Sequence, residues 1–413
     1  MHWAIIPFPL LVLAIAILPM VAPRTWERRP FQLLVVSACA LPVLIHLMLT
    51  KGGAAEVIDE ATSYASFVAT LGALYVTSGG IHIAGGRRAT PATNVAIVVV
   101  GAILASLVGT TGASMLLIRP LLAANRHRVN RAHLVPFFIL TVANAGGLLT
   151  PLGDPPLLVG YIGGVPFFWT FRLFPAWLLY VGTCAACLYW VDRRTETREI
   201  SDHGGRAAVP AVPRRIEGKH NVALLLAVIP AALLPLGIRE LFMLALAGCS
   251  LILTPRAVHR DNGFSFAPIV DVAVIFAGLF ACLAPLKVAL SEAGPSFPLH
   301  RGWQLFWASG LLSSVLDNAP TYTVFAALAR GLSVGGDGLV AGISPHKLAA
   351  ISIGSVVMGA TTYIGNGPNL MVKAIAEREH FPTPTFFRHA ALAFVVLCPA
   401  HIVTTLALAF LDR

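Results

Sequence analysis

Two aspartates interrupt long apolar stretches of this chain, where an unpaired carboxylate is costly. Asp154 stands in the sequence Pro-Leu-Gly-Asp-Pro-Pro, and Asp317 stands in Asp-Asn-Ala-Pro-Thr. At membrane depth a charged side chain costs about 2.5–3.5 kcal/mol on insertion scales and is functional by default. Burial disfavours the charged form, which suits a group that exchanges a proton for a cation. The structural alternative is that each aspartate only caps the half-helix that follows it.

Neutral oxygen-bearing side chains lie at matching positions around both aspartates. Hard cations such as Na⁺ favour carboxylate, hydroxyl and unwound carbonyl oxygens. Taken singly, a Ser or Thr in a membrane helix usually bonds its own backbone, but here such residues gather at four interruptions. The candidate binding residues are Asp154, Asp317, Asn318, Thr110, Thr111, Ser114, Asn144, Thr150, Pro320, Thr321, Thr362, Asn366 and Asn369. The candidate Na⁺ ligands among them are Asp154, Asp317, Asn318 and Asn366.

The composition is that of an all-α integral membrane protein. The 413 residues are 57% hydrophobic and only 12% charged, whereas soluble domains carry about 25% charge. The formal charge of +10 does not indicate a nucleic-acid partner, because Lys and Arg collect in short loops as the positive-inside rule requires. The six cysteines fall in apolar segments and form no zinc motif. The lipid bilayer is the expected partner, with a homodimer as an open option.

Two apolar stretches are broken in the middle by Gly and Pro. The broken spans are predicted at 132–166 and 347–375, and the breaks at 144–156 and 359–369 are too rich in these residues to stay helical. Backbone unwinds at membrane depth only where protein or a cavity surrounds it. Paired breaks in two halves of a chain are typical of secondary transporters that bind their substrate between repeats.

Two further stretches are predicted to be re-entrant hairpins. The apolar stretch 92–124 would run about 50 Å as one helix, which exceeds the bilayer core of about 30 Å. Its middle is rich in small and hydroxyl residues, and basic residues flank both ends, including Arg87 and Arg88. Both ends therefore belong on the same, cytoplasmic side. The stretch 303–330 repeats the pattern in the second half.

Each half has five crossings, so the second half must insert upside down relative to the first. The predicted organisation is a first inverted repeat at 1–191, a cytoplasmic linker at 192–220 and a second repeat at 221–413. With both termini outside, the predicted cytoplasmic loops hold 21 of the 29 Lys and Arg residues. The remaining predicted spans are 3–21, 31–50, 65–85, 171–190, 221–236, 240–254, 269–289 and 386–411.

The order of hairpin and broken helix, repeated upside down, resembles the ion transporter superfamily. That superfamily includes dicarboxylate/sodium symporters, arsenite pumps and NhaD-type sodium/proton antiporters. The motifs at 110–114, 151–156, 317–321 and 365–369 resemble a bacterial branch labelled citrate transporter or sodium:proton antiporter. The dicarboxylate symporters carry Ser-Asn-Thr at both hairpin tips. This chain departs from that pattern, so the resemblance implies the fold but not the usual dicarboxylate site.

These observations favour a Na⁺(Li⁺)/H⁺ antiporter of the bacterial inner membrane that works by alternating access. The alternative is a cation-coupled symporter of citrate or a related di- or tricarboxylate. No paired-arginine clamp for a tricarboxylate is evident, which favours cation chemistry. An enzyme is not expected, because the chain has neither H-E-x-x-H nor G-x-S-x-G. Na⁺ and H⁺ are expected as coupling ions, with no other cofactor, and Asp317 is expected to matter more than Asp154.

Overall fold

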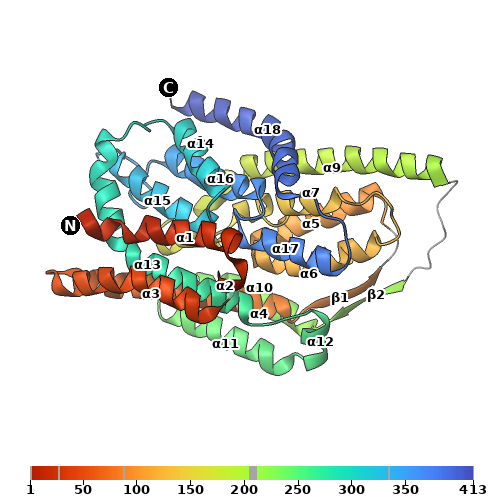
Figure 1. The fold of residues 1–413 in the computed structure, drawn as a ribbon, viewed down its shortest axis with the longest axis horizontal. Helices are drawn as coiled ribbons and strands as arrows, with labels where there is room; N and C mark the ends of the chain where they lie inside the picture. The colour runs from red at the N-terminus through yellow and green to blue at the C-terminus, as the bar shows by residue number, and fades with distance from the viewer. Residues whose placement is uncertain (1, 27, 87–88, 204–211, 334, 413) are drawn as a thin grey trace.

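The computed structural model describes residues 2–26, 28–86, 89–203, 212–333 and 335–412. Figure 1 shows long helices that run roughly along the longest axis of the molecule. Five helices in the described part of the chain are long and apolar enough to cross a membrane. The protein is therefore an all-α membrane protein, as its composition predicts.

Two helical hairpins enter the fold from opposite ends and point toward its centre (Figure 1). The first consists of α5 (Pro91–Val108) and α6 (Thr110–Ala124), and the second of α14 (Gly302–Ser313) and α15 (Asn318–Gly331). Gly109 makes the first turn with a φ of 84°, a conformation in which side chains other than glycine are strained. The two hairpins lie in the stretches 92–124 and 303–330.

Each broken span forms two helices separated by irregular backbone. The first span contains α7 (Leu134–Thr141), the short 3₁₀ helix η2 (Ala145–Leu149) and α8 (Pro155–Ile162). The second contains α16 (Pro345–Met358), η5 (Gly359–Thr361) and α17 (Gly367–Arg378). In both spans a proline opens the second helix, where its missing N–H costs nothing. The breaks fall at the predicted glycine- and proline-rich segments.

The other helices surround these four interrupted elements. They are α1 (Pro7–Val21), α2 (Pro23–Trp26), α3 (Arg29–Leu49), α4 (Gly53–Gly79), α9 (Phe174–His203), α10 (His220–Ala232), α11 (Ile238–Leu253), α12 (Arg256–Asp261), α13 (Ala267–Ala293) and α18 (Phe386–Leu411), with η1 (His2–Ile5), η3 (Phe167–Leu173) and η4 (Gly294–Ser296). Helices α1, α3, α4 and α13 share one apolar cluster, in which Phe67 stacks on Phe276. Helices α9, α14, α16 and α18 share another.

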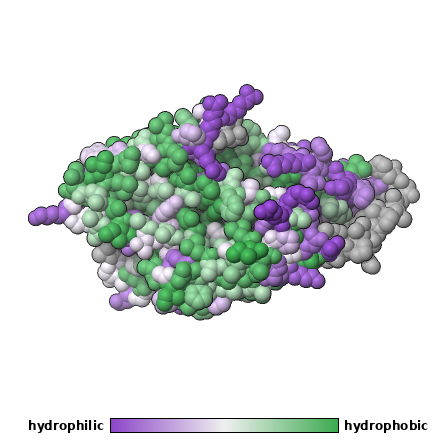
Figure 2. Space-filling model, turned by 90° about the horizontal axis from the view of Figure 1, so that it is seen from below, coloured by the Kyte–Doolittle hydropathy of each residue, from purple (hydrophilic) through white to green (hydrophobic). Residues whose placement is uncertain are grey.

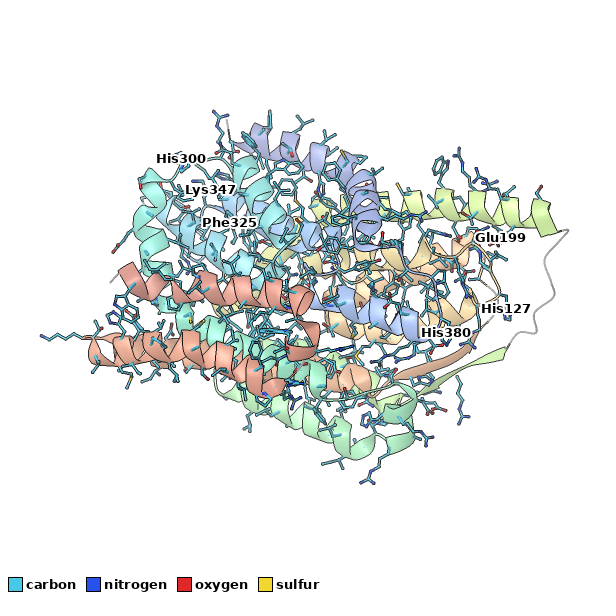
Figure 3. All side chains as sticks on the ribbon, viewed as in Figure 1. His127, Glu199, His300, Phe325, Lys347 and His380 are labelled. Atoms are coloured by element: carbon cyan, nitrogen blue, oxygen red, sulfur yellow. The ribbon has the colours of Figure 1, made fainter. Side chains whose placement is uncertain are left out.

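Polar side chains gather at the ends of the molecule. Figure 2 shows apolar residues over the left and middle of one face, and polar residues chiefly toward the right of the view and in a group that projects at the top. Figure 3 places His127, Glu199 and His380 at that end, and His300 and Lys347 at the other. A broad apolar surface of this kind suits contact with the hydrocarbon core of a bilayer.

A small antiparallel ribbon was not predicted. Strand β1 (His82–Gly86) pairs with β2 (Val212–Glu217), so the end of the predicted span 65–85 joins the predicted linker. Helix α9 also continues to His203, well into that linker. The predicted linker is thus partly built of regular structure, while Arg87 and Arg88, which flank the first hairpin, lie outside the described residues.

Candidate functional site

Asp154 is the point at which all four interrupted elements meet. Its side chain is 1% exposed. Its Oδ1 accepts hydrogen bonds from the Thr110 hydroxyl at 2.8 Å and the Asn366 amide at 3.2 Å. Its Oδ2 accepts one from the Asn318 amide at 2.5 Å. The three donors come from the first hairpin, the second hairpin and the second break, so one carboxylate binds all of them.

Close backbone contacts place this carboxylate at the first hairpin tip. The Thr110 amide donates to the Gly153 carbonyl at 2.8 Å, which joins the start of α6 to the residue before Asp154. A Cβ on Gly153 would lie 2.1 Å from the Gly147 carbonyl oxygen, so only glycine fits there. Asp154 precedes α8, but its side chain makes no capping bond to that helix. Its carboxylate is therefore free to face the hairpin tips.

A second layer of amides fixes the donors around Asp154. The Asn366 amide also donates to the Ala143 carbonyl at 3.0 Å and to Asn144 Oδ1 at 3.2 Å. Asn144 in turn donates to Asn369 Oδ1 at 2.7 Å. Asn369 donates to the carbonyls of Gly359 and Thr362, each at 2.9 Å. This chain of amides connects the two breaks directly to each other.

Two buried oxygens near this network have no hydrogen-bond partner among the described residues. They are Asn318 Oδ1 and Ser114 Oγ. Ser114 lies one helical turn beyond Thr110 on the same face of α6. A cavity of about 20 Å³ adjoins the site and is lined by Tyr75, Thr110, Thr111 and Asp154, among others. Such a volume holds about one water-sized occupant. Most of the cavity lining is apolar, including Leu71, Leu74 and Leu152, so the oxygens suited to a bare cation are those around Asp154 itself.

Asp317 occupies a different position from Asp154. Its side chain is half-buried and accepts a hydrogen bond from the Ala319 amide at 3.1 Å, which caps α15. Among the described residues, no three His, Cys, Asp or Glu side chains are arranged so that they could hold a metal ion together. Any cation here would therefore depend on neutral oxygens as well as on Asp154.

Most of the other predicted residues shape the hairpins and breaks rather than line the cavity. Thr150 donates to the Ser106 carbonyl, and Thr362 donates to the Ser314 carbonyl at 2.6 Å. Each threonine thus joins a break to its neighbouring hairpin. Thr321 bonds the Asp317 carbonyl within its own turn, and Pro320 is buried next to it in α15.

Sequence reasoning missed several residues that hold the breaks in place. Ser106 and Trp177 both donate to the Gly146 carbonyl, and Ser313 donates to the Ser355 carbonyl at 2.6 Å. His389 donates from Nε2 to the Ala360 carbonyl at 3.1 Å. Only a general indication of these residues was present in the sequence. Carbonyl groups in unwound backbone need hydrogen-bond donors, and Ser106, Ser313 and His389 are polar residues in otherwise apolar segments.

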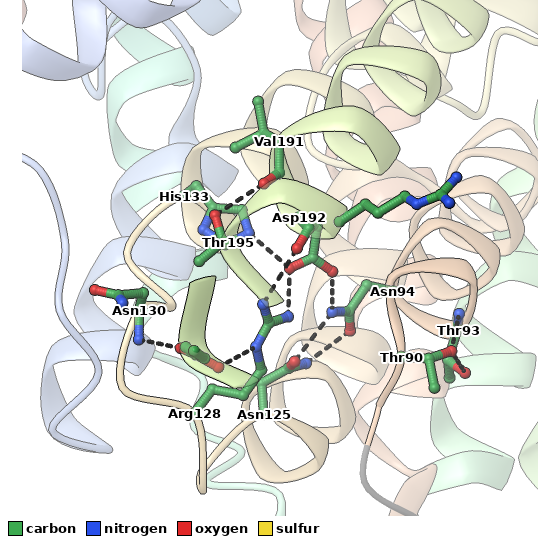
Figure 4. A network of polar contacts seen from close by, with 12 residues as sticks. Thr90, Thr93, Asn94, Asn125, Arg128, Asn130, His133, Val191, Asp192 and Thr195 are labelled. Atoms are coloured by element: carbon green, nitrogen blue, oxygen red, sulfur yellow. Dashed lines mark hydrogen bonds and ion pairs between the residues drawn. The ribbon is translucent and has the colours of Figure 1, made fainter. Parts of the chain in front are cut away.

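The base of each hairpin is anchored by an aspartate of a long helix, Asp192 within α9 and Asp412 at the end of α18. Asp192 of α9 is fully buried and binds Arg128, His133 at 2.9 Å and Asn94 at 2.8 Å. Asn94 also pairs with Asn125, so the start of α5 and the end of α6 are joined there (Figure 4).

Asp412, at the end of α18, anchors the base of the second hairpin. It accepts hydrogen bonds from the amides of Gly302 at 2.9 Å and Trp303 at 3.4 Å, the first residues of α14. His346 lies 3.4 Å from the same carboxylate. Burial lowers the pKa of His346 below its usual value, and the Asp412 charge opposes that effect.

A larger cavity of about 350 Å³ lies further along α8 and α15. Its lining includes Arg330, Lys287, Asp59, Tyr322 and Thr323. Lys287 is paired with Glu60 at 2.5 Å, whereas the described residues give Arg330 only carbonyl partners, on Ala341 and Gly163. This cavity has the size of small-molecule sites and begins one to two helical turns from Asp154.

Comparison with known families decides the class of protein. Residues 1–410 match the family described as "Putative citrate transport". The chain belongs to this family. The citrate-transport family assignment confirms the resemblance to citrate transporters within the ion transporter superfamily, while the NhaD-type branch stays a prediction. A search of curated proteins gives no match. As a member of the citrate-transport family, the protein is a multi-pass membrane transporter.

Proposed function

We propose that this transporter exchanges Na⁺ or Li⁺ for H⁺ at Asp154. The observation that carries the proposal is a fully buried carboxylate whose three donors, Thr110, Asn318 and Asn366, are all neutral. A buried carboxylate without a cationic partner is costly to keep charged. Either a cation or a proton removes that cost, so the two compete for one group, which is the requirement for antiport.

The ligands for the cation are oxygens around Asp154. The Thr110 hydroxyl already contacts Asp154, and Asn318 Oδ1 and Ser114 Oγ are unpaired. Hard cations bind such carboxylate, amide and hydroxyl oxygens. The proposal gives Asp154 the role of the exchanging group and Asp317 that of the α15 cap. Because the hairpins enter from opposite ends, separating either tip from Asp154 would open the site to one side.

Citrate symport is the second candidate, and it is supported by the family name and by the 350 Å³ cavity. Arg330 faces that cavity without an acidic partner among the described residues and suits a carboxylate. The 20 Å³ cavity at Asp154 holds an ion and not an organic acid. In this second function the cation at Asp154 would drive uptake of an anion bound in the larger cavity.

Purified protein in liposomes that contain a pH-sensitive dye distinguishes the two functions. Antiport predicts proton movement when Na⁺ or Li⁺ is added without citrate, and its loss in Asp154→Asn. Proton movement that requires citrate would reject the first function in favour of the second. Unchanged exchange and pH dependence in Asp154→Asn would show that the exchanging group lies elsewhere.

A further inference from the structure

The end of α9 presents different chemistry on its two sides. Asp192 and Glu199 face the protein, where both contact Arg128. Arg193, Arg194 and Arg198 are exposed on the other side. With Trp190 and Thr197 they line a shallow hollow of about 350 Å³. Basic charge is therefore concentrated on the face that points away from the hairpin.

Among the ion pairs of the described residues, none joins Arg193, Arg194 or Arg198 to an acidic side chain, whereas the neighbouring Asp192 and Glu199 are both held by Arg128. Arg194 instead lies over the ring of Trp190, with its guanidinium carbon 3.6 Å from the ring centroid. Stacking of this kind orients a guanidinium while leaving its N–H groups available to another ligand. The hollow is therefore a cationic surface with an aromatic floor, and none of its three arginines is paired with an acidic side chain of the residues that the structure describes.

The position along the helix indicates what covers this surface. Charged residues of the candidate span Phe167–Glu199 begin at Asp192 after a long uncharged stretch, and just before them Tyr189 and Trp190 are 41% and 55% exposed. Exposed aromatic residues at the end of a span mark the lipid headgroup level. The arginines follow within the next two turns, on the side predicted to be cytoplasmic. An anionic phosphodiester at headgroup depth meets both the charge and the aromatic ring.

We propose that this hollow binds the headgroup of an anionic phospholipid such as phosphatidylglycerol. The guanidinium groups bind the phosphate, because Arg matches its oxygens in a two-pronged geometry. The bound lipid holds the end of α9 at the membrane surface. Asp192, on the opposite side of the same turn, anchors the base of the first hairpin, so the lipid steadies that anchor. This site is independent of the exchange proposed at Asp154.

Binding of fluorescent phosphatidylglycerol to the full-length protein in detergent micelles tests this site. The variant Arg193→Gln/Arg194→Gln/Arg198→Gln is expected to lose roughly fivefold in affinity for each arginine removed. The matched variant Lys219→Gln/Arg256→Gln/Arg260→Gln changes three exposed basic residues elsewhere, one just before α10 and two in α12, and is expected to bind like the unchanged protein. Phosphatidylcholine is expected to bind weakly to all three proteins.

Three results would overturn the proposal. The first is equal phosphatidylglycerol affinity in the α9 variant and the unchanged protein, with both eluting as folded protein in gel filtration. The second is an equal loss in the matched variant, which would show only general charge attraction. The third is displacement of the lipid by millimolar inorganic phosphate, which would identify a plain anion site instead.

Discussion

The Asn318 amide donates a 2.5 Å hydrogen bond to the Asp154 carboxylate across 164 positions of sequence. Asp154 belongs to the first broken span and Asn318 to the second hairpin. Thr110 and Asn366 complete the same arrangement from the two remaining elements. Neither half of the chain alone contains the site, so the site forms only when the two halves pack against each other.

Removing the charge of Asp154 tests its role directly. Asp154→Asn keeps the shape of the side chain, and we expect it to abolish Na⁺-dependent proton movement in liposomes. Asp317→Asn should retain transport, because Asn caps a helix about as well as Asp. Loss of transport in Asp317→Asn together with normal transport in Asp154→Asn would reverse the proposed roles.

Asn318 is expected to contribute to cation affinity. Asn318→Ala removes a donor to Asp154 and an unpaired oxygen, and a hydrogen bond to a charged group contributes about 1.5–3 kcal/mol. The Na⁺ concentration for half-maximal exchange should therefore rise by roughly tenfold or more. Thr321→Val, which loses only a bond to its own helix, is the control and should change it little.

Gly153 is expected to be essential for the first break. Gly153→Ala would bring a Cβ within 2.1 Å of the Gly147 carbonyl oxygen, and backbone cannot move aside cheaply. The expected result is loss of folded protein in gel filtration. Gly367→Ala is the matched control, because nothing lies within 4 Å of its added Cβ. Equal yields of both variants would contradict the close approach at Gly153.

The anchor of the first hairpin is expected to be a strong contributor to stability. Asp192→Ala leaves the buried guanidinium of Arg128 without its nearest carboxylate, and breaking a buried pair costs about 3–5 kcal/mol. The midpoint of thermal unfolding should fall clearly. Asp261→Ala, at an exposed ion pair with Arg260, should leave it nearly unchanged.

The anchor of the second hairpin is expected to weaken in acid. The pKa of His346 is lowered in the folded protein, so the unfolded chain binds its proton more readily. Stability from this group is therefore present above its unfolded pKa of about 6.5 and is lost as pH falls below it. His346→Gln should flatten the fall in thermal midpoint between about pH 7 and 5. The same fall in both proteins would assign it to other groups.

The sequence was most informative where composition alone decides backbone conformation. Glycine and proline cannot continue a helix through 144–156 or 359–369, and the structure breaks both spans there. The sequence did not show which way each aspartate side chain points in the fold. Asp154 and Asp317 look alike in sequence, yet only Asp154 receives donors from all the interrupted elements, because that depends on how the unwound backbone turns its side chain.

Long-range partners were also beyond the reach of local patterns. Asp192 lies within α9 and Asp412 caps the end of α18, and nothing nearby in sequence marks Asn94 or Gly302 as their partners. The pairing of β1 with β2 joins segments that an entire hairpin, broken span and long helix separate. Such contacts depend on the assembled fold.

The β1–β2 ribbon has a mechanical consequence. It pairs His82 with Glu217 and Gly86 with Val212, so the chain enters and leaves the intervening region at one place. That region carries the first hairpin, the first break and α9. The covalent backbone therefore joins this region to the rest of the protein only beside the ribbon, and everywhere else side-chain contacts hold it, among them those of Asp154 with Asn318 and Asn366. Tilting the region as a unit would bend the backbone beside the ribbon and would have to break these contacts.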